Sequence, residues 1–225
     1  MERFLIFSHI FCGGTVLLLG LINFINRKGS KNHRILGKIY VGAMWWICLS
    51  ALLIISFYRF NTFLMVIAVL TFYSSFTGLR VLRRKKIGSE KWYDWAVAFI
   101  TSLFGLGLLI YSAYLFAYAS VAYLAVLCAV FGTFTMTAGF RDLKFFFNKT
   151  SSQAKWWLYQ HVSAISGSYI AAVTAFAVQN PDLFLSESSY QWLLWILPSV
   201  IGSPLISIKK RKLRALNVKA YRKSL

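Results

Sequence analysis

Seven long apolar runs restrict the folds that this sequence can adopt. They are residues 4–25, 36–57, 60–79, 94–114, 119–140, 157–178 and 190–208. Each is close to the length of about 20 residues that an α-helix needs to cross the hydrocarbon core of a bilayer. The runs are continuous, without the apolar–polar alternation of barrel strands, and a helix satisfies its own backbone hydrogen bonds in lipid. The sequence therefore predicts an all-α, polytopic membrane bundle of seven transmembrane helices.

The composition excludes the main alternatives to a membrane protein. Of 225 residues, 58% are apolar and 14% are charged, whereas soluble domains are about one quarter charged. An aromatic content of 18% argues against intrinsic disorder. The three cysteines lie inside apolar runs and are too few for a disulfide framework: Cys12, Cys48 and Cys128.

The basic residues predict how the bundle is oriented. Of 25 lysines and arginines, 23 fall after the first, third, fifth and seventh runs, and only Arg3 and Arg59 fall on the opposite side. By the positive-inside rule, the amino terminus lies outside and the carboxyl terminus lies in the cytoplasm. We therefore expect a transmembrane domain over residues 1–208 and a basic cytoplasmic tail over residues 209–225.

The net charge of +19 raises the question of a polyanionic partner. Nucleic-acid-binding proteins gather their charge on one folded face, whereas here it is divided among the ends of membrane helices. We therefore expect no nucleic acid as a partner. The tail could bind anionic lipid, at about 1 kcal/mol per cation near the surface. Alternatively, it acts only as a topology determinant.

A short internal similarity suggests a parallel repeat. The pattern Gly-x-Arg-x-Leu occurs at 78–82 and 139–143, and each copy is followed by Lys-Trp at the start of the next run. This predicts a repeat in which the second and third, fourth and fifth, and sixth and seventh helices form equivalent pairs. The repeat puts His33, Asp94 and His161 at equivalent cytoplasmic helix beginnings.

The three histidines are candidate functional residues. His9 and His161 lie inside apolar runs, where an ionisable group is by default a hypothesis for function. His33 precedes the second run, and Gly37 follows it by one helical turn, leaving a notch beside the imidazole for a flat cofactor or another helix. The alternatives are that His33 is simply solvated and that the glycines serve close packing.

Two carboxylates lie at cytoplasmic helix ends. Asp94 is expected near Arg80, and Asp142 directly follows Arg141 in the sequence. The carboxylates are candidate metal ligands, since Asp joins His in many metal sites. The alternative is that they form interfacial ion pairs that fix the loops, each contributing little to stability.

Four stretches carry a resemblance to a known family: residues 8–14, 17–20, 32–41 and 161–176. They resemble a family of bacterial multi-pass membrane proteins whose domain has no assigned function. The resemblance implies a place in the bacterial plasma (inner) membrane and supplies no activity. More loosely, a His in one helix, a basic turn and a His opening the next helix resemble the transmembrane di-haem cytochromes b. With only three histidines, this chain could hold at most one bis-histidine haem.

The first functional hypothesis is a redox module. His33 and His161 would be the axial ligands of one b-type haem in the inner leaflet, with Gly37 admitting the macrocycle. His9 would then face a quinone near the outer surface.

The second hypothesis is a metal-dependent hydrolase of a lipid amide or ester. His33 and His161, with Asp94 or Asp142, would hold Zn²⁺ or Fe²⁺ and leave one position open for water. No His-x-x-x-His or His-Glu-x-x-His spacing supports this set.

The third hypothesis needs no cofactor: a transporter, a channel or a small subunit bound to a larger membrane-protein complex. We expect Pro198, Gly202 and Pro204 to break or kink the last run, which would fit a transporter in a general way.

Overall fold

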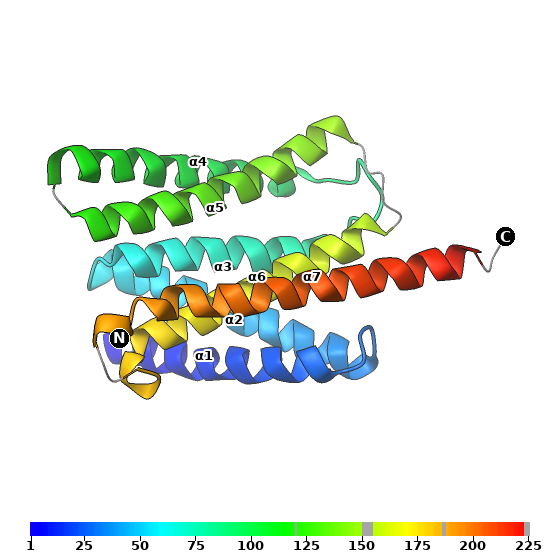
Figure 1. Cartoon of the computed structure of the whole chain (residues 1–225), viewed down its shortest axis with the longest axis horizontal. Coiled ribbons are helices and arrows are strands. Elements are labelled where there is room, and N and C mark those ends of the chain that lie inside the picture. Colours follow the sequence, from blue (N-terminus) through cyan, green and yellow to red (C-terminus); the bar gives the residue numbers. More distant parts are fainter. Residues whose placement is uncertain (120, 150–154, 186–187, 223–225) are drawn as a thin grey trace. The chain divides into compact units, whose positions relative to one another are not determined.

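Seven long helices make up the fold (Figure 1), which a computed structural model describes for residues 1–119, 121–149, 155–185 and 188–222. They are α1 (Glu2–Ile25), α2 (Lys31–Phe57), α3 (Thr62–Arg80), α4 (Trp92–Tyr114), α5 (Ala122–Asn148), α6 (Trp156–Gln179) and α7 (Leu193–Arg222). A π-helical turn, η1 (Leu115–Ala119), and two 3-10 turns, η2 (Pro181–Leu183) and η3 (Ser188–Tyr190), complete the described elements, which include no strand. All seven long helices are apolar enough to cross a membrane, which confirms the predicted fold class.

Several helices extend beyond the apolar runs that predicted them, among them α2, α5 and α7. α2 begins at Lys31, five residues before the second run, because Ser30 caps it: the Ser30 Oγ accepts a hydrogen bond from the backbone N of His33 at 3.2 Å. His33 therefore precedes the apolar run but lies in the first turn of α2, one helical turn before Gly37. The apolar run marks only the part of a helix that suits hydrocarbon, whereas the helix itself continues into the polar interface.

α7 corrects the expectation of a broken last span. It is one continuous helix with Pro198 and Pro204 in its interior, and it runs on past the expected domain boundary at residue 208. Transmembrane helices tolerate proline because neighbouring groups satisfy the freed carbonyls. Gly202 has a packing role: a Cβ there would lie 2.6 Å from Cγ1 of Ile170, so the glycine lets α7 approach α6. The argument for a transporter from a broken span is therefore removed, whereas a kink at these residues stays a prediction.

The chain divides into two compact units. Unit 1 comprises Met1–Leu79 and Leu158–Leu225, and unit 2 comprises Arg80–Trp157. In unit 1, a buried cluster on α1, α2 and α3 includes Val16, Met44 and Ala68. A pair of buried hydroxyls joins two helices of this unit: the Tyr40 hydroxyl on α2 lies 2.9 Å from the Ser168 Oγ on α6. α6 is thereby joined to α2 by a polar contact inside the membrane-spanning region.

Unit 2 is mainly a hairpin of α4 and α5 (Figure 1). Small residues let the two backbones approach, as is usual for membrane helix pairs. A Cβ added to Gly105 would lie 2.8 Å from the carbonyl oxygen of Gly132, and Gly139 lies equally tightly against α4. Near the η1 end, the Ser112 Oγ donates a hydrogen bond to the carbonyl oxygen of Ala125 at 2.7 Å.

Candidate functional site

His161 has a defined partner inside unit 1. Its Nδ1 lies 2.7 Å from the carbonyl oxygen of Gly78, near the end of α3. Because a carbonyl oxygen only accepts hydrogen bonds, Nδ1 carries the hydrogen, and in the neutral imidazole Nε2 then keeps a lone pair. Gly78 permits this contact, since a Cβ there would lie 2.7 Å from Cγ1 of Ile165 on α6.

His33 lies at the same end of unit 1, which we call the basic end. His33 lies in the first turn of α2, and His161 lies in the second turn of α6 beside the carboxyl end of α3. Its Nδ1 is buried and has no hydrogen-bond partner among the described residues. A Cβ added to Gly37, one turn further along α2, would meet only the Asn23 Nδ2, at 3.7 Å. The notch expected beside His33 is therefore not filled by close packing.

His9 lies towards the opposite end of unit 1. Its Nδ1 is 2.9 Å from the Oγ of Ser50, which itself donates to the carbonyl oxygen of Ile47 at 3.0 Å. Ser50 follows His33 by 17 positions on α2, or about 25 Å at 1.5 Å per residue. His9 is thus well separated from the other two histidines, as its predicted place near the other membrane surface requires.

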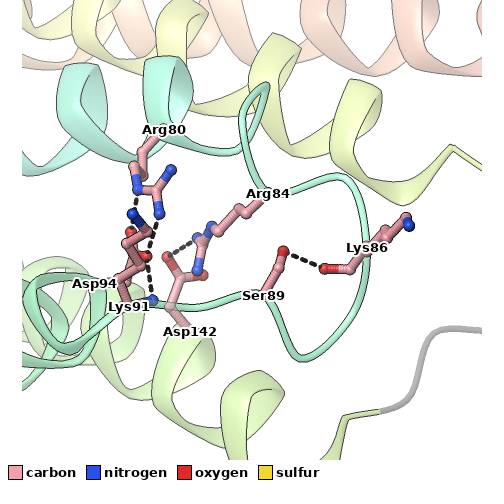
Figure 2. A network of polar contacts seen from close by, with 7 residues as sticks. All are labelled: Arg80, Arg84, Lys86, Ser89, Lys91, Asp94 and Asp142. Carbon is pink, nitrogen blue, oxygen red and sulfur yellow. Dashed lines mark hydrogen bonds and ion pairs between the residues drawn. The ribbon is translucent and has the colours of Figure 1, made fainter.

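The two candidate carboxylates both form ion pairs in unit 2 (Figure 2). The Asp94 Oδ2 accepts hydrogen bonds from the Arg80 Nη2 at 3.0 Å and from the backbone N of Lys91 at 2.9 Å. The Asp94 side chain is 1% exposed, so this pair is buried. The sequence predicted that Asp94 lies near Arg80, with an ion pair as the alternative to metal binding, and the structure shows that ion pair.

Asp142 pairs with an arginine that the sequence did not indicate. Its carboxylate lies 3.8 Å from the Nη2 of Arg84 and not beside Arg141, because adjacent residues on a helix point about 100° apart. Arg84 is 2% exposed and lies over the ring of Phe146 at 4.5 Å. Arg80, at the end of α3, thus pairs with Asp94, and Arg84, in the loop between α3 and α4, pairs with Asp142.

The described residues do not assemble the metal set that the second hypothesis needs. Among them, no group of three or more His, Cys, Asp and Glu side chains could hold a metal ion. Within unit 2, the carboxylates of Asp94 and Asp142 form ion pairs with arginines. The hydrolase hypothesis therefore has no observation in its favour.

The sequence did not predict the roles of three groups at these sites: the Gly78 carbonyl, Ser50 and Arg84. The carbonyl of Gly78 is a backbone group, which no residue type reveals. Ser50 is a small polar residue within an apolar run, and the pairing of Arg84 depends on how the loop after α3 folds. Only the spacing of Arg84 from Arg80, one helical turn, could have suggested that both arginines face the same way.

The chain matches the model of a known protein family over residues 6–131, which is more than half of its length. The matched region includes His9, His33 and Gly37 and ends before His161, so the likeness noted at 161–176 lies outside it. No curated protein and no solved structure matches the chain. The chain belongs to the family described as predicted membrane protein DUF2306.

Proposed function

We propose that this integral membrane protein is a redox module that binds one b-type haem at the basic end of unit 1, with His33 and His161 as axial ligands. The observation that carries the proposal is the contact between the His161 Nδ1 and the Gly78 carbonyl oxygen, at 2.7 Å. Iron-binding histidines commonly donate their second ring N–H to a backbone carbonyl in this way. The contact fixes the ring orientation and leaves Nε2 as a ligand.

His33 supplies the second half of the argument. Burying a ring nitrogen without a hydrogen-bond partner costs free energy. The buried His33 Nδ1 has no such partner among the described residues, which favours a ligand that takes up its lone pair or its hydrogen. Two imidazoles are a suitable donor set for haem iron. The space at Gly37, where only Asn23 comes within 4 Å of an added Cβ, lies one turn from His33.

The chain's own residues have limited roles in this proposal. A bound haem would supply one-electron transfer. The Gly78 carbonyl orients His161, the α2 cap at Ser30 holds the first turn that carries His33, and the apolar helices around them exclude water. Following the family resemblance and the distribution of basic residues, we place the protein in the bacterial plasma membrane with this end facing the cytoplasm.

Replacing His161 tests the proposal directly. Wild-type protein purified in detergent from haem-replete cells should show a Soret band with about one haem per chain, and His161→Ala should lose at least 90% of it, since one axial ligand and its anchor are gone. His9→Ala is the matched control, because it removes the other histidine that bonds through Nδ1 and should leave the band unchanged. A colourless wild-type preparation would refute the proposal.

The notch at Gly37 gives a second, independent test. Gly37→Ala should fold like the wild type, because its Cβ would meet only an ordinary contact at 3.7 Å. Gly37→Leu fills the notch and should lower the haem content severalfold. The control is Gly42→Leu, on the same helix, where nothing lies within 4 Å of the added Cβ. Equal haem content in both leucine variants would contradict a cofactor beside Gly37.

A further inference from the structure

An apolar groove runs along one side of the α4–α5 hairpin in unit 2. Its volume is about 700 Å³, which is in the range of small-molecule sites. The residues that line it fall on one face of each helix, from Trp95 to Leu106 on α4 and from Met136 to Phe147 on α5. The only hydroxyl in this lining is that of Ser102, which donates a hydrogen bond to its own helix, to the carbonyl oxygen of Ala98. The groove therefore suits a hydrocarbon chain.

The groove is about as long as one leaflet of a bilayer is thick. From Trp95 to Leu106 the axis of α4 rises by about 16 Å, at 1.5 Å per residue. Half of the hydrocarbon core is about 15 Å. One end of the groove lies where α4 begins and α5 ends, since the rings of Trp95 and Phe147 are 4.8 Å apart there. The groove thus leads from the membrane interface towards the middle of the bilayer.

The interfacial end of the groove is held in place by buried neighbours. The Trp95 ring packs on the Phe146 ring, 5.2 Å away, and Phe146 is 1% exposed. The Arg84 guanidinium lies over the other contact surface of this cluster, 4.5 Å from the centre of the Phe146 ring. On the rim, the Phe140 side chain projects and is 61% exposed. Because the entrance is built by the fold, a ligand does not have to order it on binding.

A cation flanks the same end of the groove. Lys144 follows Phe140 by four positions on α5 and precedes Phe147 by three. Side chains at these separations are neighbours on a helix surface, with about 5–6 Å between their Cβ atoms. The Lys144 side chain is exposed, so its ammonium group can reach a ligand at the entrance. An anion above an apolar chain is therefore complementary to this part of unit 2.

We propose that the α4–α5 groove binds one acyl chain of an anionic phospholipid whose phosphate lies beside Lys144. An acyl chain is the apolar partner that a bilayer supplies. A second protein helix fits less well, because membrane helices associate through small residues that let backbones approach. Here the large side chains of Phe99 and Phe140 stand at the groove and would hold another helix away. The inference is independent of the haem proposal, since the groove lies wholly within unit 2.

Filling the groove tests the place of the acyl chain. Native mass spectrometry of the purified full-length chain would follow the binding of phosphatidylglycerol and phosphatidylcholine. We expect the wild type to retain phosphatidylglycerol, and Ala96→Phe to weaken this binding at least tenfold, because Ala96 lines the groove. Ala113→Phe is the matched control: it makes the same change at an exposed position of α4 outside the groove. Equal losses in both variants would overturn the proposed site.

Removing the cation tests the place of the phosphate. Lys144→Gln should weaken the preference for phosphatidylglycerol over phosphatidylcholine about fivefold, which is the effect expected of one cation near the membrane surface. Arg141→Gln removes the same charge from α5, on a face about 100–160° from the residues that line the groove, and should change the preference much less. Equal effects of the two changes would show a diffuse attraction to the net charge and contradict a phosphate beside Lys144.

Two further outcomes would overturn the proposal. If the wild type binds both lipids equally, the headgroup assignment is wrong. If the wild type is a dimer that Ala96→Phe dissociates, the groove holds a second copy of the chain and not a lipid. Circular dichroism would check that each variant is folded. Should Ala96→Phe misfold, the comparison of Lys144→Gln with Arg141→Gln still decides, because both of these side chains are exposed.

Discussion

Gly105→Ala should destabilise unit 2 by about 3 kcal/mol, at the upper end of the usual cost of overpacking. The added Cβ would lie 2.7 Å from the Cα of Met136 and 2.8 Å from the carbonyl oxygen of Gly132. Both are backbone atoms of α5, which cannot rotate away as a side chain can. The helices must therefore separate along their contact, and many van der Waals contacts weaken together.

The measurement is denaturation of detergent-solubilised protein by added SDS, followed by circular dichroism and tryptophan fluorescence. Gly107→Ala is the matched control, since it makes the same change two residues away on α4, where nothing lies within 4 Å of the new Cβ. We expect it to unfold like the wild type. Equal midpoints for the two variants would contradict the close approach of α4 and α5 at Gly105.

Asp94→Asn should cost about 3–5 kcal/mol, the usual penalty for leaving one partner of a buried ion pair without its counter-charge. The amide oxygen of the new side chain would still accept a hydrogen bond from the backbone N of Lys91. The variant therefore loses the charge of Asp94 and keeps the hydrogen bond that caps α4. The Arg80 guanidinium would lose the carboxylate 3.0 Å away and keep its contact with the Tyr93 ring, 4.9 Å from its centre.

Glu2→Gln provides the comparison for this second prediction. It also breaks an Arg–carboxylate pair, but the Arg59 side chain is 85% exposed and the atoms are 4.0 Å apart. Exposed pairs of this kind contribute about 0–1 kcal/mol. The same SDS titration should therefore separate the two variants clearly. Similar midpoints would mean that Asp94 and Arg80 are solvated in the membrane-embedded protein.

The seven helices could be predicted because the thickness of hydrocarbon imposes a length on every apolar run. Their ends could not, since they depend on caps such as Ser30 in polar surroundings, where hydropathy carries no signal. Pro198 and Pro204 misled the prediction for α7 because their cost depends on neighbouring groups that a single segment does not reveal.

The candidate site was predictable to a similar extent. His33 and His161 stood out because imidazoles are rare in such a chain, and the structure brings them to one end of unit 1. The acceptor for His161 is a main-chain oxygen of α3, 83 positions earlier in the chain, so only tertiary packing could supply it. Tertiary packing likewise decides that Asp142 pairs with Arg84 and not with its sequence neighbour Arg141.

The continuity of α7 has a mechanical consequence. Its 30 residues span about 45 Å, whereas the bilayer interior is about 30 Å thick. The helix projects beyond the other helices of unit 1 (Figure 1), and it stays helical through both prolines. One continuous helix therefore joins the projecting end of α7 to the segment that contacts Ile170 of α6 at Gly202, so a movement of that end also shifts this buried contact.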